Sequence, residues 1–226
     1  AEQMPPSNFF TSIADTDNED EEDDIDDYES ILDLCATTLP QMRLKWHYRS
    51  RFEQLIAFSN KNYYDNDLVT FPSAQKDKKG CGVDYYFVAG VFDRTARTNR
   101  IEAEYVVDLV FDNLRRYPDR SLGVVTFSAS QQDLVDRLIA RRRDDPSYEE
   151  YFRTDREEPF FVKNLETVQG DERDTIILDV AYGRDQQGKL LLNFGPLNRA
   201  GGERRLNVAV TRAKINVQAV SYTHLT

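Results

Sequence analysis

The chain has 226 residues, long enough for one large domain or two small ones with a substantial hydrophobic core. Apolar residues make up 40% of it and charged residues 31%, a balance typical of a globular protein with a heavily solvated surface. Its net charge of -11 comes from residues 1–40, which hold thirteen acids and no Lys or Arg, so the other 186 residues carry 29 bases against 27 acids. That near-neutral body excludes a strongly basic nucleic-acid-binding protein, but it does not repel nucleic acid.

Cysteine, histidine and hydropathy exclude further classes. Cys35 and Cys81 lie far apart and only two histidines occur, so neither a disulfide framework nor a zinc site is expected. Two free thiols are typical of a reducing cytoplasm. The sequence has no signal peptide and no apolar run that could span a bilayer, and we expect a soluble cytoplasmic protein without a membrane partner. Because the chain starts at Ala1, without Met, we expect a fragment of a longer protein.

The first third of the chain changes from an acidic tract to helices. Residues 11–29 are too charged and too poor in apolar residues to fold alone, and they predict a disordered linker. Helices are predicted over 30–40, stopped near Pro40, and over 51–64. A loop through DKKGCG then leads to a predicted strand over 84–92.

The remaining residues alternate between strand and helix patterns. Helical spacing of apolar residues predicts a helix over 99–117, and Asn99 and Glu102 are interpreted as residues of its start. The other predicted elements are a strand over 121–127, a helix over 130–143, strands over 162–168 and 174–182, a helix over 204–214 and a strand over 215–220. This alternation predicts an α/β domain with a mainly parallel sheet. The P-loop pattern G-x-x-x-x-G-K-[ST], which binds triphosphate, does not occur in the sequence.

Four short stretches place polar or charged groups at the end of a predicted strand or helix, where open α/β sheets bind ligands. They are EQMPPS near the start, LKWHYRSR at 44–51, ETVQGDERDTIIL at 166–178 and RRLNVAVTRAK at 204–214. In this order they resemble the motifs of the second RecA-like domain of superfamily-one helicases, in the branch that contains the eukaryotic nonsense-mediated-decay helicase. The resemblance is strongest to bacterial helicases that carry a Vsr-like endonuclease domain. It implies a three-layer RecA-like α/β fold.

The resemblance also implies domain boundaries. Residues 1–10 would be the end of the third helicase motif, 11–29 the acidic linker and 30–220 the second RecA-like domain. The last residues, 221–226 (SYTHLT), depart from the family, and we expect them to be a non-native tail.

The resemblance implies that residues of these motifs contact ATP. Gln3 would sense the γ-phosphate, and Tyr48 would lie close to the adenine. Arg49 and Arg212 would reach the γ-phosphate as arginine fingers, because a guanidinium can donate two bonds to phosphate oxygens and offset charge that grows in the transition state. From the residues alone, Arg49 is equally a surface arginine at a helix start, and Gln3 is part of a bend in a tail.

The stretch ETVQGDERD adds a second group of nucleotide-binding residues. Gln169 and Gly170 predict a tight turn between two strands, where glycine permits close approach of a ligand. The resemblance implies that Glu172 accepts hydrogen bonds from the ribose hydroxyls. It also implies that Thr167 and the Gln-Gly turn contact the nucleic-acid backbone or relay its presence. The alternative is a polar hairpin whose charges serve solubility.

Nucleic-acid contacts are implied for the stretch GVVTFSASQQ. Thr126, Ser128 and Gln131 could bond phosphates or sugars, and such contacts position a strand without reading its sequence. The alternative is that these residues only cap a helix. The basic run at 137–143 could add an electrostatic patch, or it could form a solvated helix face.

The function implied is the C-terminal motor domain of an ATP-dependent helicase or translocase acting on single-stranded DNA or RNA. ATP with Mg²⁺ would bind mainly to a missing first RecA-like domain, and no metal ligand is expected in this chain. That first domain and a downstream Vsr-like nuclease domain are the implied protein partners, and the fragment alone is expected to be inactive. A different class stays open: a non-catalytic nucleic-acid-binding or protein-interaction module of a larger defence or repair protein.

Overall fold

A computed structural model describes residues 31–73, 78–190 and 193–222. The chain divides into two compact units, with the boundary between Lys45 and Trp46. In the first unit, helix α1 (Ile31–Thr38) confirms the helix predicted over 30–40. The predictions for residues 1–10 and 11–29, Gln3 among them, lie outside the described residues, and a RecA-like domain bounded at 30–220 stays a prediction.

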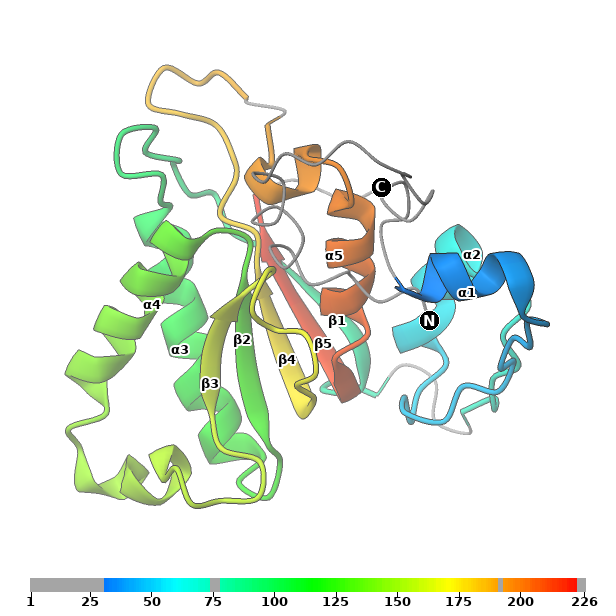
Figure 1. Cartoon of the computed structure of the whole chain (residues 1–226). Helices are drawn as coiled ribbons and strands as arrows, with labels where there is room; N and C mark the ends of the chain where they lie inside the picture. Colours follow the sequence, from blue (N-terminus) through cyan, green and yellow to red (C-terminus); the bar gives the residue numbers. More distant parts are fainter. Residues whose placement is uncertain (1–30, 74–77, 191–192, 223–226) are drawn as a thin grey trace, which may run out of the picture. The chain divides into compact units, whose positions relative to one another are not determined.

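The second unit is built on one sheet of five parallel strands in the order β1-β5-β4-β2-β3 (Figure 1). The strands are β1 (Gly82–Phe87), β2 (Leu122–Thr126), β3 (Phe161–Asn164), β4 (Arg173–Asp179) and β5 (Ala213–Ser221). Because the pairs run parallel, the strands begin at one edge of the sheet, here the amino edge, and end at the other, the carboxyl edge. The predicted α/β class with a mainly parallel sheet is confirmed.

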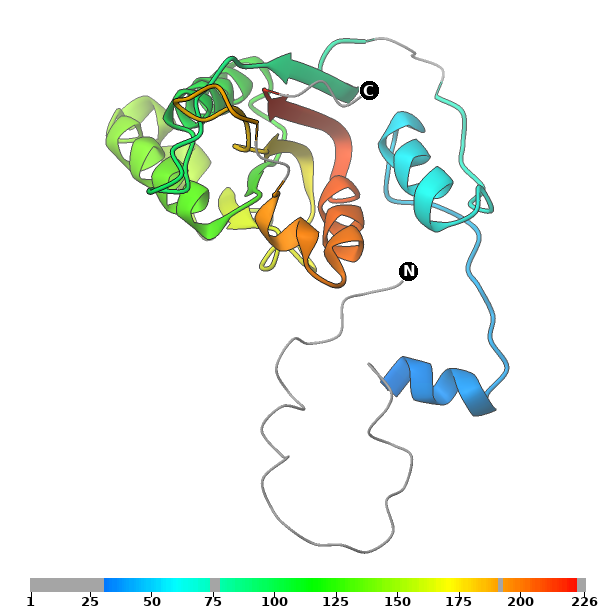
Figure 2. The ribbon, with the colours of Figure 1, turned by 90° about the horizontal axis from the view of Figure 1, so that it is seen from above.

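Helices cover both faces of this sheet and complete three layers (Figures 1 and 2). One face carries α3 (Arg100–Arg116) and α4 (Ala129–Arg142), and the other carries α2 (Gln54–Tyr63) and α5 (Gly202–Val210). Two short 3₁₀ helices are η1 (Pro146–Phe152) and η2 (Gly195–Asn198). None of the helices in the described part of the chain is long and apolar enough to cross a membrane.

Each central strand contributes side chains to two hydrophobic cores, because successive side chains of a strand point to opposite faces of the sheet. Val124 and Ile177 pack against α3 and α4, whereas Val125 and Ile176 belong to the core under α5. All four side chains are fully buried. Burial on both faces explains why SLGVVTF and DTIILDVAY read as almost continuous apolar runs.

Most predicted elements are present, and several of the predicted ends are wrong, among them the end of the strand predicted over 174–182, which stops at Asp179. The helix predicted over 204–214 stops at Val210, because Ala213 already pairs with Arg173 of β4. The strand predicted over 162–168 stops at Asn164, and the strand predicted over 84–92 stops at Phe87. Pairing with the neighbouring strand sets where these elements begin and end, and a local apolar pattern does not contain that information.

Candidate functional site

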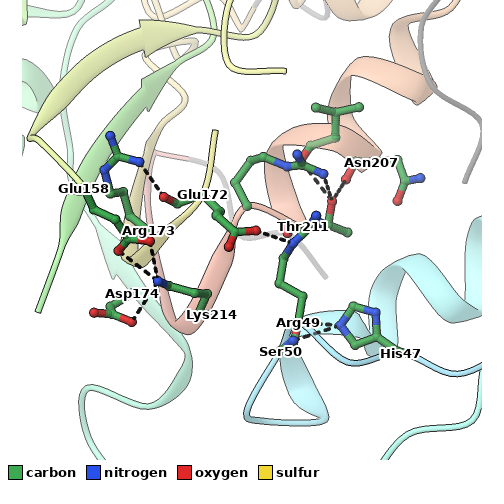
Figure 3. A network of polar contacts seen from close by, with 12 residues as sticks. His47, Arg49, Ser50, Glu158, Glu172, Arg173, Asp174, Asn207, Thr211 and Lys214 are labelled. Atoms are coloured by element: carbon green, nitrogen blue, oxygen red, sulfur yellow. Dashed lines mark hydrogen bonds and ion pairs between the residues drawn. The ribbon is translucent and has the colours of Figure 1, made fainter. Parts of the chain in front are cut away.

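Arg49, Glu172 and Arg212 are the predicted site residues that lie at the amino edge of the sheet. Arg49 lies ahead of α2, Glu172 directly before β4 and Arg212 directly before β5. The Nε of Arg49 donates to Oε2 of Glu172 at 2.8 Å, and its Nη1 lies 3.5 Å from the carbonyl oxygen of Thr211 (Figure 3). The side chains of Arg49 and Glu172 are 24% and 41% exposed, so both remain accessible to a ligand. We call Arg49, Glu172 and Arg212 the arginine cluster.

Arg212 is held in place by the end of its own helix. Its Nε donates to the carbonyl oxygen of Val208 at 2.8 Å and its Nη2 to the hydroxyl of Thr211 at 3.2 Å. The pKa of Arg212 is lowered, first by burial and next by the positive charge of Arg49, while Glu172 acts in the opposite direction. Glu172 pairs with Arg49, whereas Arg212 forms no ion pair with a carboxylate of the described residues, so the positive charge of Arg212 stays unpaired in a half-buried place. Such a place favours an anion.

Both guanidiniums keep N–H donors for a ligand. Within the described ranges, neither the Nη2 of Arg49 nor the Nη1 of Arg212 donates a hydrogen bond to the protein. The same ranges hold no group of three His, Cys, Asp or Glu side chains that could bind a metal ion. The donor set therefore fits phosphate oxygens and does not fit Mg²⁺.

Residues 46–51 present Arg49 through a fixed turn. The backbone N–H of Arg51 donates to the carbonyl oxygen of Lys214 at 2.8 Å, which ties the turn to the start of β5. The backbone N–H of Ser50 donates to Nε2 of His47 at 3.1 Å. Burial, and after it the charge of Arg49, lowers the pKa of His47. A neutral imidazole can accept this hydrogen bond, so His47 shapes the turn in its uncharged form.

The segment 165–172 returns from the carboxyl edge to the amino edge, because β3 and β4 both run in the same direction. Leu165 and Val168 are fully buried and anchor it against the sheet. Gln169 and Gly170 form the predicted turn, with Gly170 at φ +90°, and both are exposed. The alternative of a hairpin is wrong, since β3 and β4 each pair with β2 and not with each other.

Two other predicted site residues are accessible. The side chain of Tyr48 is 89% exposed, one residue before Arg49. Thr167 is exposed as well, and its hydroxyl accepts a hydrogen bond from the backbone N–H of Asn164 at 3.2 Å. Both side chains could reach a ligand without rearrangement of the core.

The remaining residues predicted to bind nucleic acid have internal partners at the carboxyl edge. Thr126 is fully buried and donates to the carbonyl oxygen of Ser128 at 2.9 Å. Gln131 is also fully buried; its Oε1 accepts from the backbone N–H of Asn99 at 2.9 Å, and its Nε2 donates to Asp179 at 2.9 Å. Ser128 caps α4 by accepting from the backbone N–H of Gln131 at 3.2 Å. As placed, Thr126 and Gln131 offer no polar atom to a ligand.

A second charged group of residues adjoins the amino edge. The Nζ of Lys214 donates to both carboxylate oxygens of Glu158, at 2.6 and 2.8 Å, and lies 3.6 Å from Asp174 (Figure 3). These residues line a cavity of about 310 Å³, whose full lining is Asp119, Ser121, Arg156, Glu157, Glu158, Asp174 and Lys214. Four acids face two bases there, so the cavity does not suit a phosphate. Asp174 has a structural role here, since its carboxylate accepts a hydrogen bond from the backbone N–H of Ser121 at 3.1 Å.

A protein-family model described as "AAA domain" matches residues 28–223 of the chain. The chain belongs to this AAA-domain family. Two relatives are proteins named as uncharacterized ATP-dependent helicases, one from Mycoplasma genitalium with 37% identity over 230 residues and one from Mycoplasma pneumoniae with 35% over 229. Each alignment covers 96% of this chain and 20% of the relative. The AAA domain described here therefore spans about a fifth of the length of these relatives.

Among solved structures, the AAA domain is similar to one described as the C-terminal domain of a possible DNA helicase from Lactobacillus plantarum. The two share 14% sequence identity with a TM-score of 0.44, over 79% of this chain and 89% of that chain.

The AAA domain also contains a buried residue whose importance the sequence reasoning missed. Glu102, interpreted as a residue of a helix start, is fully buried; its Oε1 accepts from the backbone N–H of Ala181 at 2.7 Å and its Oε2 from Asn99 at 3.2 Å. Burial, and after it the charge of Asp179, raises the pKa of Glu102. Glu102 lies four residues before Val106, in the buried stripe of α3. That position was the available signal, because a carboxyl in an apolar stripe requires partners.

Proposed function

We propose that this chain is the second RecA-like motor domain of an ATP-dependent superfamily-one helicase or translocase that acts on single-stranded DNA or RNA. Membership of the AAA-domain family and the names of the two Mycoplasma relatives support this reading. The observation that carries it is the arginine cluster, which gathers two guanidiniums from segments more than 160 residues apart at one accessible place. The branch that contains the nonsense-mediated-decay helicase, and a downstream Vsr-like nuclease domain in a cytoplasmic parent protein, remain parts of the proposal.

The arginine cluster would complete an ATP site whose other half lies on a first, P-loop-containing RecA-like domain. Arg49 and Arg212 would donate their unused N–H groups to the γ-phosphate and offset the charge that develops during transfer, an effect worth about 10³ to 10⁵ in rate. Their backbone anchors limit how far each guanidinium must reorganise, which keeps the donors aimed at one place. Mg²⁺ would be bound by the first domain, since the cluster offers cationic donors.

Tyr48, Glu172 and the Gln-Gly turn would contact the rest of the nucleotide. The exposed ring of Tyr48 can stack on a base, and Glu172 can accept from ribose hydroxyls once it exchanges its bond to Arg49. Gln3 would sense the γ-phosphate, by resemblance alone. Thr167, Gln169 and Gly170 would report the presence of a nucleic-acid strand through the anchored segment 165–172.

An Arg212→Ala change in the full-length parent protein tests this proposal. We expect ATP binding to stay within about threefold of the unchanged protein, while the rate of hydrolysis falls about 10³-fold or more, because the arginine acts mainly in the transition state. Arg137→Ala, which removes an exposed arginine of α4, is the matched control and should hydrolyse ATP normally. Normal turnover by the Arg212→Ala protein would remove Arg212 from the role proposed.

The isolated 226-residue chain provides a second test, because it would hold only half of the site. We expect no steady ATP hydrolysis from the pure chain with Mg²⁺, with or without single-stranded nucleic acid. Steady turnover would contradict the division of the site between two domains. A parent protein that lacks a P-loop would instead favour the alternative of a non-catalytic nucleic-acid-binding or protein-interaction module.

A further inference from the structure

Two loops lie side by side above the carboxyl edge of the sheet (Figure 1). The first, residues 88–99, follows β1, and the second, residues 180–190, follows β4. The backbone N–H of Phe92 donates to the carbonyl oxygen of Arg184 at 2.9 Å, and Nδ2 of Asn99 donates to that of Ala181 at 3.1 Å. Beside these loops, the chain passes from β2 to α4 on one face of the sheet and from β4 to α5 on the other face. Parallel sheets commonly bind ligands at the carboxyl edge where connections diverge in this way.

Tyr182 holds a third segment against the two loops. Its ring lies 5.3 Å from that of Phe92 and 5.6 Å from that of Phe194, measured between centroids. Its hydroxyl lies so close to Gly195 that a Cβ there would be 2.2 Å from it. The side chain is buried, so the residues that follow Phe92 and those that follow Phe194 are brought to one place.

Each of these segments carries an exposed arginine without a partner. Arg97 and Arg199 make no side-chain hydrogen bond and no ion pair with any residue of the described ranges. Arg97 lies in a turn at φ +57°, built on Asp93, whose Oδ1 accepts from the backbone N–H groups of Thr95 and Ala96 at 2.7 and 3.0 Å. Burial raises the pKa of Tyr182, and the positive charges of Arg97 and Arg199 both oppose that rise.

Two other arginines of this edge, Arg94 and Arg184, already have partners within the protein. Arg94 pairs with Asp185, which also accepts from two backbone N–H groups. Arg184 donates to the hydroxyl of Tyr222 at 3.0 Å and to the carbonyl oxygen of Gly188 at 2.8 Å. Arg97 and Arg199 therefore provide positive charge that the protein itself does not neutralise.

We propose that Arg97 and Arg199 bind backbone phosphates of a single nucleic-acid strand that crosses the carboxyl edge of the sheet. This inference rests on the proposed function and assigns contacts that the sequence had placed on Thr126 and Gln131. Arg97 and Arg199 place two exposed guanidiniums on segments that pack around Tyr182. Such groups suit backbone phosphates, which are bound through their charge and independently of base sequence. The nucleic acid would then lie at the carboxyl edge, opposite the arginine cluster at the amino edge. The nucleotide and the nucleic acid would therefore contact opposite ends of the same β-strands.

Binding of a fluorescein-labelled oligothymidylate of about 16 nucleotides to the 226-residue chain tests this proposal by fluorescence anisotropy. We expect the double change Arg97→Ala and Arg199→Ala to raise the dissociation constant at least about tenfold at low salt. The slope of log K against log salt should fall by about 1.4, the value for two single-strand phosphate contacts. An oligouridylate of equal length tests whether ribose changes the result.

The matched control is the double change Arg115→Ala and Arg116→Ala, which removes the same charge from the end of α3, where both arginines are exposed. It should change binding less than about twofold. Equal effects of the two double variants, or no effect of the first, would overturn this inference, and thermal unfolding will report whether each variant folds. If the unchanged chain binds neither oligonucleotide, the inference fails. If binding behaves as expected while Arg212→Ala leaves hydrolysis intact in the parent, the ATPase proposal fails and this one stands.

Discussion

The two edges of the sheet use polar residues in opposite ways. At the amino edge, the arginine cluster is charged and partly open, with side chains 24% and 41% exposed for its Arg49–Glu172 pair. At the carboxyl edge, Asn99, Glu102, Gln131 and Asp179 are fully buried and bond mainly to one another and to the backbone. We call these four residues the carboxyl network.

The difference shows which polar groups remain available to a ligand. In the arginine cluster the N–H donors outnumber the internal acceptors, so donors remain for a substrate. In the carboxyl network nearly all the hydrogen-bonding groups already have partners within the protein. The network joins the starts of α3 and α4 to the end of β4. The Oδ1 of Asp179 accepts no hydrogen bond from the described residues as placed, and a proton held by the neighbouring Glu102 can supply one. The first arrangement permits chemistry, and the second fixes the fold.

The largest effect should come from removing both arginines of the cluster in the parent protein. If Arg49 and Arg212 act on the same phosphate, each single change to Ala should lower hydrolysis by about 10³-fold or more, and the double change should cost much less than the product of the two. Single-turnover ATPase assays of the four proteins measure this. Independent, multiplicative losses would mean that the two residues do not form one functional unit.

The carboxyl network should affect stability instead. Glu102→Ala would leave the backbone N–H of Ala181 and the amide of Asn99 without acceptors and open a cavity, so we expect a loss of about 3 kcal/mol in the free energy of unfolding. Glu102→Gln keeps the shape and the bond from Ala181 and can donate an N–H to Asp179, but it loses the bond from Asn99, whose Nδ2 keeps the carbonyl oxygen of Ala181. It should therefore cost about 1 kcal/mol at neutral pH, clearly less than Glu102→Ala. Urea unfolding of the three proteins tests this, and equal losses would show that hydrogen bonding of Glu102 contributes little.

The same pair predicts a dependence of stability on pH. Burial and the charge of Asp179 raise the pKa of Glu102 to about 10, and burial raises that of Asp179 to about 6. Because folding raises both values, the folded state holds more protons than the unfolded chain, and this contribution to stability is lost as pH rises from about 4 to 10. The unfolding free energy should therefore fall more steeply with pH in the unchanged chain than in Glu102→Gln. Parallel pH profiles of the two would show that Glu102 is charged when folded.

The smallest effect on stability should come from breaking the ion pair at the amino edge. Glu172→Gln removes a carboxylate from an exposed pair, which contributes about 1 kcal/mol or less. We expect the urea midpoint to change little, whereas ATP hydrolysis in the parent should fall if Glu172 contacts the ribose. A loss as large as that of Glu102→Ala would mean that the arginine cluster is a structural element, and the contrast between the two edges would be wrong.

Much of the fold could be predicted because its signals are local. Apolar spacing gave α3 its length, and Asn99 caps it by accepting from the backbone N–H of Glu102 at 3.2 Å. The turn at Gly170 could be predicted because glycine readily adopts a positive φ, and φ is +90° there. The end of α5 at Val210 could not be read in this way, because the pairing of Ala213 with a strand about 40 residues earlier ends the helix.

By itself, the sequence determined the parallel α/β architecture and the residue types suited to phosphate, because both depend on local patterns and side-chain chemistry. Only the tertiary structure decided which of the polar residues are accessible. It buried Thr126, Gln131 and Glu102 and left Arg97 and Arg199 unpaired at the surface. The physical reason is that solvent exposure and hydrogen-bond partners arise from contacts between segments distant in the chain, and no local pattern specifies which carboxyl will face water.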